Sequence, residues 1–295
     1  MTVTAARPRA RDLLEDAVTR LAAAGVPTPR VDAEWLLSAA LGIDRGRLGL
    51  ELDGVPPAPA VARYDVWVRR RAERVPLQHL LGTQAFRDVT VRVNADVLVP
   101  RPETELVVSW ALELVPGPGA RVPLVLDVGT GSGCIACAIA VERPDVRVVG
   151  LELSPAAAGV ARDNVAALGL TGRVTVLTGD LFSAADPTRA DLIVSNPPYL
   201  PTDVVDTLEP EITRHEPRAA IDGGRDGLDV VRRLVPEASR RLRPGAWLLL
   251  ETAGGGQADA VAALLEASGL AEITARRDLT GTTRFVAGRR RAEET

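Results

Sequence analysis

Lysine is absent from the 295 residues, so all 35 basic residues are arginines, and the chain has only two histidines, two cysteines and one methionine. The arginines are scattered, which indicates a coding bias rather than a special use of guanidinium groups. With 39 acidic residues the formal net charge is −4. This balance argues against a surface built mainly to bind nucleic-acid phosphates, and we expect no direct nucleic-acid binding.

Long apolar runs are also missing. No stretch approaches the ~18 apolar residues that cross a membrane, and the opening residues, MTVTAARPRARDLLEDAV, lack the apolar core of a signal peptide. The hydrophobic fraction of 46% and the charged fraction of 25% are ordinary for a globular protein. We therefore expect a folded, cytoplasmic protein that does not contact a membrane.

The two cysteines, Cys134 and Cys137, lie three residues apart in the apolar run GCIACAIA. A Cys-x-x-C pair can serve a redox or a metal site. A second pair is missing, however, and the chain offers only two histidines as further ligands. We interpret both cysteines as small core residues of a helix, and we expect no metal.

The N-terminal part of the chain has the pattern of a helical bundle. Apolar residues recur at helical spacing in three segments, 11–25, 31–42 and 61–75. Residues 1–78 are therefore predicted to form a small helical domain. Residues 79–100 alternate apolar and polar side chains over much of their length, which predicts a linking β-hairpin.

From residue 101 to residue 295, strands alternate with helices. This alternation is typical of βαβ crossovers, so we predict an α/β domain with a mostly parallel, seven-stranded sheet covered on both faces. The last two strands are predicted to form an antiparallel edge. The predicted strands are 123–129, 147–153, 173–180, 190–196, 246–252, 271–278 and 282–288, and the predicted helices are 134–143, 154–168, 226–242 and 256–269.

Ligands of open α/β sheets bind beyond the carboxyl ends of the strands. The first strand ends in the loop Gly129-Thr130-Gly131-Ser132-Gly133, in which glycine permits a tight turn and the close approach of a ligand. A dinucleotide loop would have a glycine at position 134, and the Lys-Ser/Thr pair of a phosphate-binding loop is missing. Alone, this loop could be a generic connection between a strand and a helix.

The next two strand ends supply complementary groups. Glu152 can accept hydrogen bonds from two ribose hydroxyls, as the acid of a Rossmann fold does, although alone it could be a solvated loop residue. Asp180 offers a carboxylate to an exocyclic amine, and Leu181 offers an apolar surface to adenine. Together the three strand ends specify an adenosine without a diphosphate, so we predict S-adenosyl-L-methionine as the cofactor.

The fourth strand is followed by Asn196-Pro197-Pro198-Tyr199. Asn196 has an amide acceptor, and each proline keeps its carbonyl but has no N–H. These acceptors can grip an NH2 group and orient its lone pair toward a methyl donor, without a strong base in the tetrapeptide. Tyr199 could stack on a planar target. The alternative is a proline turn that only ends the strand.

Four blocks carry a resemblance to a known family. VLVPRPETE (97–105), VLDVGTGSG (125–133), SNPPY (195–199) and HEPRAAIDGGRDGL (215–228) resemble the HemK/PrmC family of protein-glutamine N5-methyltransferases, which modify class-I peptide-chain release factors. With the helical N-terminal part, the resemblance covers nearly the whole chain. It implies a Rossmann-like, S-adenosylmethionine-dependent methyltransferase domain at 101–295 and a substrate-recognition role for 1–78.

The resemblance also implies roles for individual residues. The cofactor would be held by Gly129, Thr130, Gly131, Ser132, Gly133, Glu152, Asp180, Leu181 and Asn196. The glutamine amide of a Gly-Gly-Gln motif in the release factor would be gripped by Asn196, Pro197, Pro198 and Tyr199, with Asn196, Pro197 and Tyr199 as the catalytic residues. The run Arg101–Glu105 would lie close to the active site, and Pro102 could also start a helix there.

Two stretches depart from the family pattern. Ala85 stands where an acidic residue usually precedes the phenylalanine of the hairpin, and ETAGGGQ (251–257) has its glutamine about one place late. Gly255-Gly256-Gln257 also happens to match the substrate motif of the family. We interpret this tripeptide as a loop at the start of a helix rather than as a site of self-methylation.

Three alternatives remain open. The substrate could be a glutamine of a ribosomal protein of the large subunit, or adenine N6 in DNA or RNA, since adenine methyltransferases share the tetrapeptide. The third alternative is a catalytically silent module that only binds the cofactor. The acidic balance argues against nucleic acid, and the intact tetrapeptide argues against a silent module.

Overall fold

The computed structural model describes residues 7–119, 121–185 and 189–292, and the chain forms two compact units. One unit, here the helical unit, comprises Met1–Gly82 together with Glu209–His215. The other, here the α/β unit, comprises Thr83–Leu208 and Glu216–Thr295. The sequence patterns did not indicate the return of the chain to the helical unit at residues 209–215. A substrate-recognition role for residues 1–78 stays a prediction.

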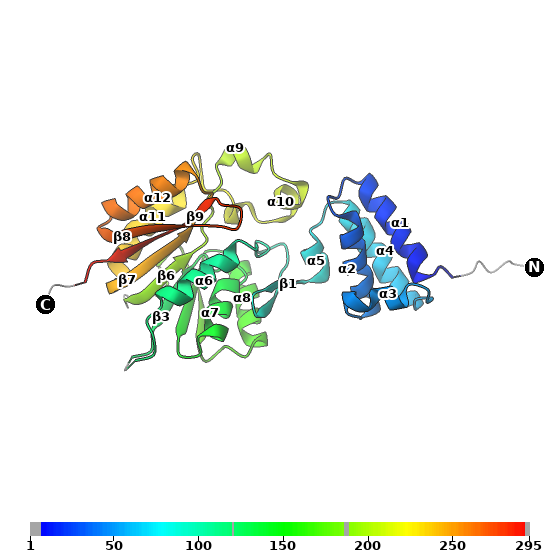
Figure 1. The fold of residues 1–295 in the computed structure, drawn as a ribbon, viewed down its shortest axis with the longest axis horizontal. Helices are drawn as coiled ribbons and strands as arrows, with labels where there is room; N and C mark the ends of the chain where they lie inside the picture. Colours follow the sequence, from blue (N-terminus) through cyan, green and yellow to red (C-terminus); the bar gives the residue numbers. More distant parts are fainter. Residues whose placement is uncertain (1–6, 120, 186–188, 293–295) are drawn as a thin grey trace, which may run out of the picture. The chain divides into compact units, whose positions relative to one another are not determined.

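The helical unit is a small bundle around an apolar core. Its residues 7–82 are drawn in blue and cyan in Figure 1, and residues 209–215 in yellow-green. Its main helices, α1 (Ala10–Ala23), α2 (Pro29–Leu41) and α4 (Ala58–Ala72), confirm the three predicted segments. Shorter elements are η1 (Arg45–Arg47), α3 (Leu48–Glu51), α5 (Leu77–Leu81) and α10 (Pro210–His215). The core is formed by side chains at the predicted helical spacing, including Leu14, Leu21, Leu36, Leu37, Tyr64 and Val68.

The ends of α2 show why this segment is helical. Pro29 occupies its first turn, where a missing N–H costs no hydrogen bond. Gly42 ends the helix in the left-handed conformation with φ of 68°, and its N–H donates to the carbonyls of the last turn. The predicted segment therefore ends at the glycine that follows it.

A buried ion network joins α2, α4 and α10. The Arg71 side chain is only 5% exposed, and its Nε donates to Asp32 Oδ2 at 2.6 Å. Its Nη1 forms an ion pair with Glu211 Oε1 at 2.7 Å. Arg74 also pairs with Glu211, at 2.6 Å between Nη2 and Oε2. Burial acts to raise the pKa of Glu211, but the hydrogen bonds from Arg74 and Arg71 outweigh it and hold that pKa below its usual range. The bundle therefore depends on a carboxylate from far along the chain.

Replacing Arg71 by methionine should destabilise the helical unit by about 3–5 kcal/mol, because Asp32 and Glu211 would stay buried without their shared cation. Denaturant unfolding of the full chain, followed by tryptophan fluorescence, measures the change; Trp35 and Trp67 of the helical unit contribute to this signal. Arg69→Ala is the matched control: its ion pair with Asp65 lies on the exposed side of the same helix, and we expect a change below about 0.5 kcal/mol. Equal effects of the two substitutions would contradict the prediction.

The α/β unit is built on a seven-stranded sheet with the order β5-β4-β3-β6-β7-β9-β8. Neighbouring strands from β5 to β7 are parallel, and β9 pairs antiparallel with both β7 and β8. The sheet and its antiparallel edge confirm the predicted α/β fold (Figure 1). The strands are β3 (Leu124–Val128), β4 (Arg147–Glu152), β5 (Val174–Thr178), β6 (Ala190–Ser195), β7 (Leu242–Glu251), β8 (Leu270–Arg277) and β9 (Thr283–Arg290).

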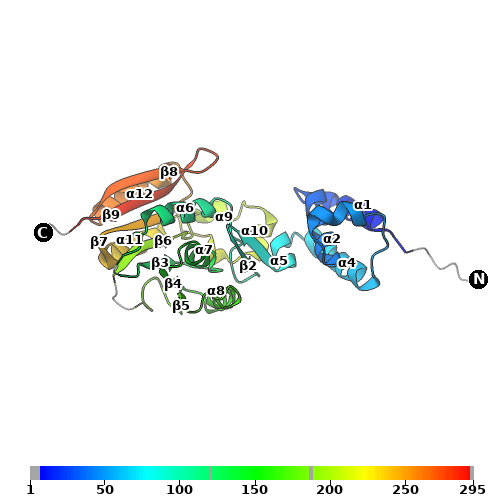
Figure 2. The same ribbon diagram turned by 60° about the horizontal axis from the view of Figure 1, so that its bottom comes forward.

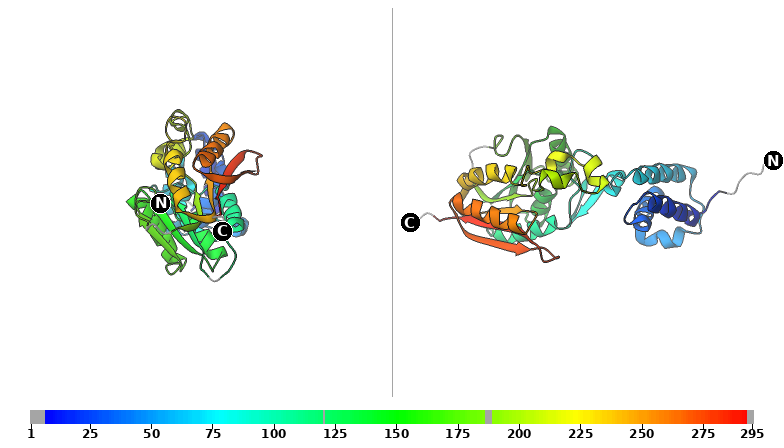
Figure 3. Two further views of the ribbon diagram at one scale, coloured as in Figure 1. Left: turned by 90° about the vertical axis from the view of Figure 1, so that its left-hand side faces the viewer. Right: turned by 90° about the horizontal axis from the view of Figure 1, so that it is seen from above.

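Helices cover both faces of this sheet, and the layers can be followed in Figure 2 and Figure 3. One apolar cluster contains Val125, Leu192 and side chains of the helices on one face, and a second contains Leu126, Ile193 and side chains from the other face. Successive strand residues therefore pack on opposite sides, as burial on both faces requires. The first cluster draws on α6 (Thr104–Leu114), α7 (Cys134–Glu142) and α8 (Pro155–Ala167), and the second on α11 (Asp229–Arg241) and α12 (Gly256–Ala267).

Local details differ from the expectations. The hairpin is shorter than residues 79–100, since only β1 (Thr83–Phe86) and β2 (Val89–Arg92) pair, while α5 occupies the residues before it. Helix α6 begins at Thr104, inside the run Arg101–Glu105 and two residues after Pro102, close to the alternative interpretation of Pro102 as a helix start. The cysteines of α7 are free and buried, and burial raises the pKa of both thiols to about 12, which confirms their place in the helix core.

The strand order reverses between β3 and β6. The chain runs outward from β3 through β4 to β5 and then returns to form β6 on the other side of β3. In such sheets the crevice outside the carboxyl ends of the two strands at the reversal is the usual ligand site. Among the described residues, no helix is long and apolar enough to cross a membrane.

Candidate active site

A cavity of about 210 Å³ lies at the carboxyl ends of β3, β4, β5 and β6. Four strand ends contribute to its wall, and they bring together residues that lie up to 69 positions apart between Gly129 and Pro198. Gly133 and Tyr199 are the two predicted site residues outside this wall. The predicted residues in the wall are Gly129, Thr130, Gly131, Ser132, Glu152, Asp180, Leu181, Asn196, Pro197 and Pro198.

The glycine loop after β3 needs its three glycines for conformational reasons. Gly129, Gly131 and Gly133 have φ of 73°, 55° and 79°, in the left-handed region that other residues rarely adopt. A Cβ atom on Gly133 would also lie 3.3 Å from the Cβ of Ala161, so this glycine permits the close packing of α8 on the loop. Gly133 therefore supports the cavity without lining it.

The backbone N–H groups of Gly129, Thr130, Gly131 and Gly133 donate within the protein. Gly129 and Thr130 donate to the carbonyl of Leu151, at 2.8 and 3.1 Å, and Gly133 donates to the carbonyl of Thr130 at 2.8 Å. Gly131 donates to Glu152 Oε2 at 2.9 Å. A phosphate-binding loop needs these groups for its anion. The loop is consequently suited to a ligand that approaches by shape rather than as a phosphate.

Glu152 has a fixed carboxylate at the end of β4. Its Oε1 accepts from the Ser154 N–H at 2.9 Å, while Oε2 accepts from Gly131. Each oxygen keeps a second lone pair, and the residue lines the cavity, so the carboxylate can accept from two hydroxyl groups. A negative charge beside the glycine loop disfavours a diphosphate there. The residues present therefore fit a nucleoside that carries no phosphate.

Asp180 and Leu181 follow β5 at the other side of the cavity. Asp180 pairs with Arg233, which also lines the cavity, and both side chains are about half exposed. Leu181 has φ of 48°, a costly conformation for a residue with a branched side chain, and its side chain packs against the apolar cluster under α11. The sequence patterns missed Arg233, because nothing in the spacing of α11 marks it as a partner of Asp180.

Asn196 is held from two sides. The preceding residue, Ser195, donates from Oγ to the carbonyl of Val128 at 2.6 Å and so ties the end of β6 to the end of β3. The Asn196 amide donates from Nδ2 to Thr104 Oγ1 at 3.1 Å. Because one end of the amide is bonded to Thr104, its plane is fixed and the oxygen Oδ1 is presented as an acceptor.

Tyr199 follows the tetrapeptide's prolines and does not line the cavity. Its hydroxyl donates to Glu251 Oε1 at 3.1 Å. Burial raises the pKa of Tyr199, and the neighbouring charge of Glu251 raises it further, so the phenol stays protonated and acts as a donor. The stacking of Tyr199 on a planar target stays a prediction.

Glu251, at the end of β7, was not predicted as a site residue. Burial raises its pKa to about 7, although the side chains of Thr104 and Tyr199 oppose the shift by hydrogen bonding to the carboxylate. Thr104 thus connects two parts of the site, because it accepts from Asn196 and also acts on Glu251. Thr104 and Glu251 lie in two stretches that the sequence analysis singled out, PRPETE and ETAGGGQ. Only the fold shows that these two residues meet.

Residues of the run Arg101–Glu105 have two roles: some line the cavity, and Glu105 binds the hairpin turn. Arg101 and Thr104 line the cavity, and Arg101 Nη2 donates to Glu216 Oε2 at 2.6 Å. The Glu216 side chain is only 1% exposed, and burial raises its pKa despite the cation. Glu105 instead accepts from the N–H of Arg87 in the hairpin turn, at 3.2 Å. The run therefore supplies one end of the cavity and the support of the hairpin.

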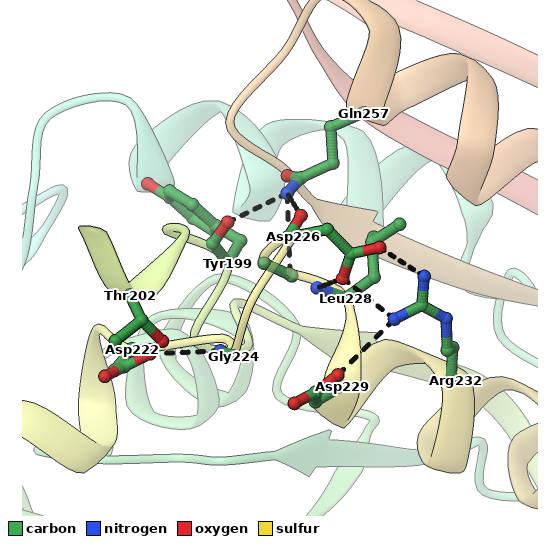
Figure 4. A network of polar contacts seen from close by, with 10 residues as sticks. Tyr199, Thr202, Asp222, Gly224, Asp226, Leu228, Asp229, Arg232 and Gln257 are labelled. Carbon is green, nitrogen blue, oxygen red and sulfur yellow. Dashed lines mark hydrogen bonds and ion pairs between the residues drawn. The ribbon is translucent and has the colours of Figure 1, made fainter. Parts of the chain in front are cut away.

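The residues after the tetrapeptide are fixed against the block at 221–228. Leu200 donates to the carbonyl of Ile221 at 3.1 Å and accepts from Gly223 at 2.8 Å, and Thr202 Oγ1 donates to Asp222 Oδ1 at 2.7 Å. Figure 4 shows the contacts of Thr202, Asp222 and Gly224 together with those of Gln257. Ile221, Asp222 and Gly223 thus hold the chain that follows the tetrapeptide.

No group of three or more histidine, cysteine or acidic residues in 7–119, 121–185 and 189–292 is arranged to hold a metal ion.

The fold and the strand-end residues define a Rossmann-like methyltransferase, and comparisons with known proteins agree. A model of the methyltransferase small domain matches residues 118–215, and a model of the PrmC N-terminal domain matches residues 12–82. A methyltransferase from Pyrococcus furiosus superimposes with a TM-score of 0.53 at 18% identity, over 70% of this chain and 91% of that one.

Relatives over nearly the full length show the family. A release factor glutamine methyltransferase of Geobacter sulfurreducens is 45% identical over 269 residues, or 91% of this chain and 92% of that protein. Proteins of the same name from Deinococcus radiodurans and Mycolicibacterium smegmatis are 45% and 42% identical, over 95% and 96% of this chain and 98% of each relative. This chain belongs to the release factor glutamine methyltransferase family, which confirms the resemblance found in the four blocks.

The raised pKa of Glu251 predicts a pH dependence of stability. The folded protein binds a proton on Glu251 up to about pH 7, whereas the ordinary value is 4.5, so this stabilising contribution is present below 4.5 and is lost as the pH rises through about 7. Glu251→Gln has no titratable group at this position, so the variant should not lose this part of the unfolding free energy as the pH rises. Relative to the parent chain, the variant should gain on the order of a few kcal/mol of unfolding free energy between about pH 5 and about pH 8.

Urea unfolding at the two pH values measures this difference. Glu266→Gln, on the exposed side of α12, serves as the control and should leave the pH dependence of the parent chain unchanged. A Glu251→Gln variant that loses stability in parallel with the parent over this range would contradict the assignment.

Proposed function

We propose that this chain transfers the methyl group of S-adenosyl-L-methionine to the side-chain amide N5 of the glutamine in the Gly-Gly-Gln motif of class-I peptide-chain release factors. The observation that carries the proposal is the Asn196 amide, fixed by Thr104 at the wall of a cavity suited to a nucleoside without phosphates. Curated relatives of nearly equal length are named for this activity. The reaction belongs to translation termination, so we expect the protein in the cytoplasm.

The residues of the cavity suit the proposed cofactor. Glu152 would accept from the two ribose hydroxyls, while Asp180 and Leu181 would lie beside the adenine. The glycine loop, Gly129–Gly133, would follow the nucleoside closely, and Asn196 would lie next to the reacting end. When bound, S-adenosylmethionine supplies an activated methyl group on a sulfonium. A solved rRNA methyltransferase of Thermus thermophilus holds AdoMet on a related fold, with a TM-score of 0.51 at 21% identity over 71% of this chain and 50% of that one.

The tetrapeptide would position the target amide. An amide nitrogen is a weak nucleophile because its lone pair is delocalised. Asn196 Oδ1 and the carbonyl of Pro197 would accept the two hydrogens of the NH2 group and hold the nitrogen in line with the methyl group, an alignment worth several kcal/mol. Pro198 would keep the backbone stiff between these acceptors and Tyr199.

No strong base is assigned to the reaction. Tyr199 keeps its proton because burial raises its pKa, and its hydroxyl is bonded to Glu251. The proton of the target nitrogen becomes acidic only once positive charge develops there, so it can leave late. Tyr199 and Glu251 would therefore stabilise the shape of the site.

The proposed partner is a class-I release factor, recognised in part by residues 1–78. The match of residues 12–82 to the PrmC N-terminal domain supports this assignment. Trp35 and Leu50 of the helical unit are 42% and 82% exposed, which leaves apolar surface for a protein partner.

Asn196→Ala should lose methyl transfer by about 100-fold or more, since it removes one of the two acceptors that orient the amide. Affinity for labelled S-adenosylmethionine should stay within about threefold, because most cofactor contacts come from other residues. Mass spectrometry of a release factor after incubation with enzyme and cofactor measures the product at the Gly-Gly-Gln glutamine. A parent chain that leaves this glutamine unmodified, or that labels nucleic acid instead, would overturn the proposed function.

Because four N–H groups of the glycine loop already donate within the protein, we expect nucleotides with phosphate groups to bind more weakly than nucleosides without them. Adenosine and S-adenosylhomocysteine should displace labelled S-adenosylmethionine, whereas ATP and NAD should bind at least about 100-fold more weakly than S-adenosylhomocysteine. Glu152→Gln should narrow this gap, because it removes the negative charge beside the loop. Equilibrium dialysis gives the affinities, and tight binding of ATP to the parent chain would refute the phosphate-free assignment.

A further inference from the structure

Gln257 does not line the cavity. Its side-chain amide nevertheless contacts three segments of the α/β unit, which contain Ala253, Tyr199 and Gly227. Figure 4 shows the contacts with Tyr199 and the segment around Gly227. Gln257 Oε1 accepts from the N–H of Ala253 at 2.7 Å, which ties it to the loop between β7 and α12. Its Nε2 donates to the carbonyl of Tyr199 at 2.8 Å and lies 3.4 Å from the carbonyl of Gly227. Both ends of the amide are therefore engaged at once.

The backbone around the Gln257 amide is closely packed. A Cβ atom on Gly227 would lie 2.1 Å from the carbonyl oxygen of Tyr199 and 2.6 Å from Gln257 Nε2, and Gly227 has φ of 76°. A Cβ atom on Gly223 would lie 2.6 Å from the carbonyl oxygen of Pro198. The glycines of the block at 223–228 thus let its backbone lie directly against the tetrapeptide, with Gln257 closing the contact.

The chemistry of this place requires an uncharged amide. The Ala253 N–H needs an acceptor, and the Tyr199 carbonyl needs a donor. Glutamine supplies both on one rigid plane, whereas ionised glutamate would turn a second negative oxygen toward the carbonyls of Tyr199 and Gly227. Leucine has nearly the same size but would leave both backbone groups without their partner.

We propose that Gln257 is a positioning residue that fixes the Tyr199 carbonyl and, through it, the acceptors of the tetrapeptide. The proposal rests on the function proposed above. Proline restricts φ at positions 197 and 198, so the backbone between Asn196 and Tyr199 is stiff. A displacement of the Tyr199 carbonyl is consequently passed to the Pro197 carbonyl, one of the two acceptors for the target amide.

The same contacts explain the Gly-Gly-Gln match at 255–257. The Gln257 nitrogen donates into the backbone of the protein instead of facing the cavity. Gly256 begins helix α12, in agreement with the interpretation of this tripeptide as the loop at a helix start. Gln257 would therefore act on the site through the Tyr199 carbonyl, and not as a methyl acceptor.

The test compares Gln257→Leu and Gln257→Glu with the parent chain, at full length, with S-adenosylmethionine and a release factor as substrates. We expect kcat to fall by about 10- to 100-fold in both variants at about pH 8, with the affinity for the cofactor within about twofold of the parent. Asp259→Asn, on the exposed side of the same helix, is the control and should keep the parent kcat.

The pH profile of Gln257→Glu separates positioning from a general loss of packing. The carbonyls of Tyr199 and Gly227 face the new carboxyl and disfavour its ionised form, so its pKa should lie above the ordinary value of glutamic acid. Protonated glutamic acid has one donor and one acceptor, as glutamine has, so the deficit in kcat should shrink by about tenfold as the pH falls from about 8 to about 6. Gln257→Leu has no titratable group, and its deficit should stay constant over this range. A constant deficit for Gln257→Glu, or a parent-like kcat in either variant, would overturn the proposal.

Hydrogen exchange provides a readout that does not need turnover. The amides of Leu200 and Thr202 donate to Ile221 and Gly224, and they should exchange at least about tenfold faster in Gln257→Leu because the tetrapeptide is no longer held. Unchanged exchange there would count against the proposal. If the parent chain failed to methylate a release factor while exchange responded as expected, the proposed function would fail and the positioning role would stand.

Discussion

The pairing of β6 directly beside β3 determines where the residues at the strand ends of the α/β unit meet. It brings the carboxyl ends of β4, β3 and β6 into one row, so the acid after β4, the glycine loop after β3 and the tetrapeptide after β6 share a cavity. The hydrogen bond from Ser195 to Val128 fastens the two central strands at their ends. A slip of one residue in this register would turn the loop and the tetrapeptide away from each other.

Local pattern was enough to predict this arrangement, because each step depends on residues that are close in sequence. The alternation of apolar strands and amphipathic helices predicts a parallel sheet, and parallel strands present their carboxyl ends on one edge. Gly129, Glu152 and Asn196 could therefore be assigned to one cavity from their places at strand ends alone. The family resemblance then narrowed an NH2 group beside a methyl donor to a glutamine amide.

The contacts that the sequence did not predict all join segments that are far apart along the chain. Thr104 meets Asn196 across 92 positions, and Tyr199 meets Glu251 across 52. Gln257 reaches the Tyr199 carbonyl across 58 positions, and Arg71 meets Glu211 within the helical unit. No periodicity marks such pairs, since they follow from how loops pack. Their residues had been noticed only as parts of specific blocks, without a reason for each side chain.

The return of residues 209–215 to the helical unit has a consequence for synthesis of the chain on the ribosome. Residues 7–82 emerge first and carry Arg71 and Asp32, but Glu211 follows only after most of the sheet has been translated. Until then the buried guanidinium has one of its two carboxylates. Completion of the amino-terminal bundle is thus delayed in time although its helices lead the sequence, and a truncated gene that ends at residue 82 would encode a bundle without this last ion pair.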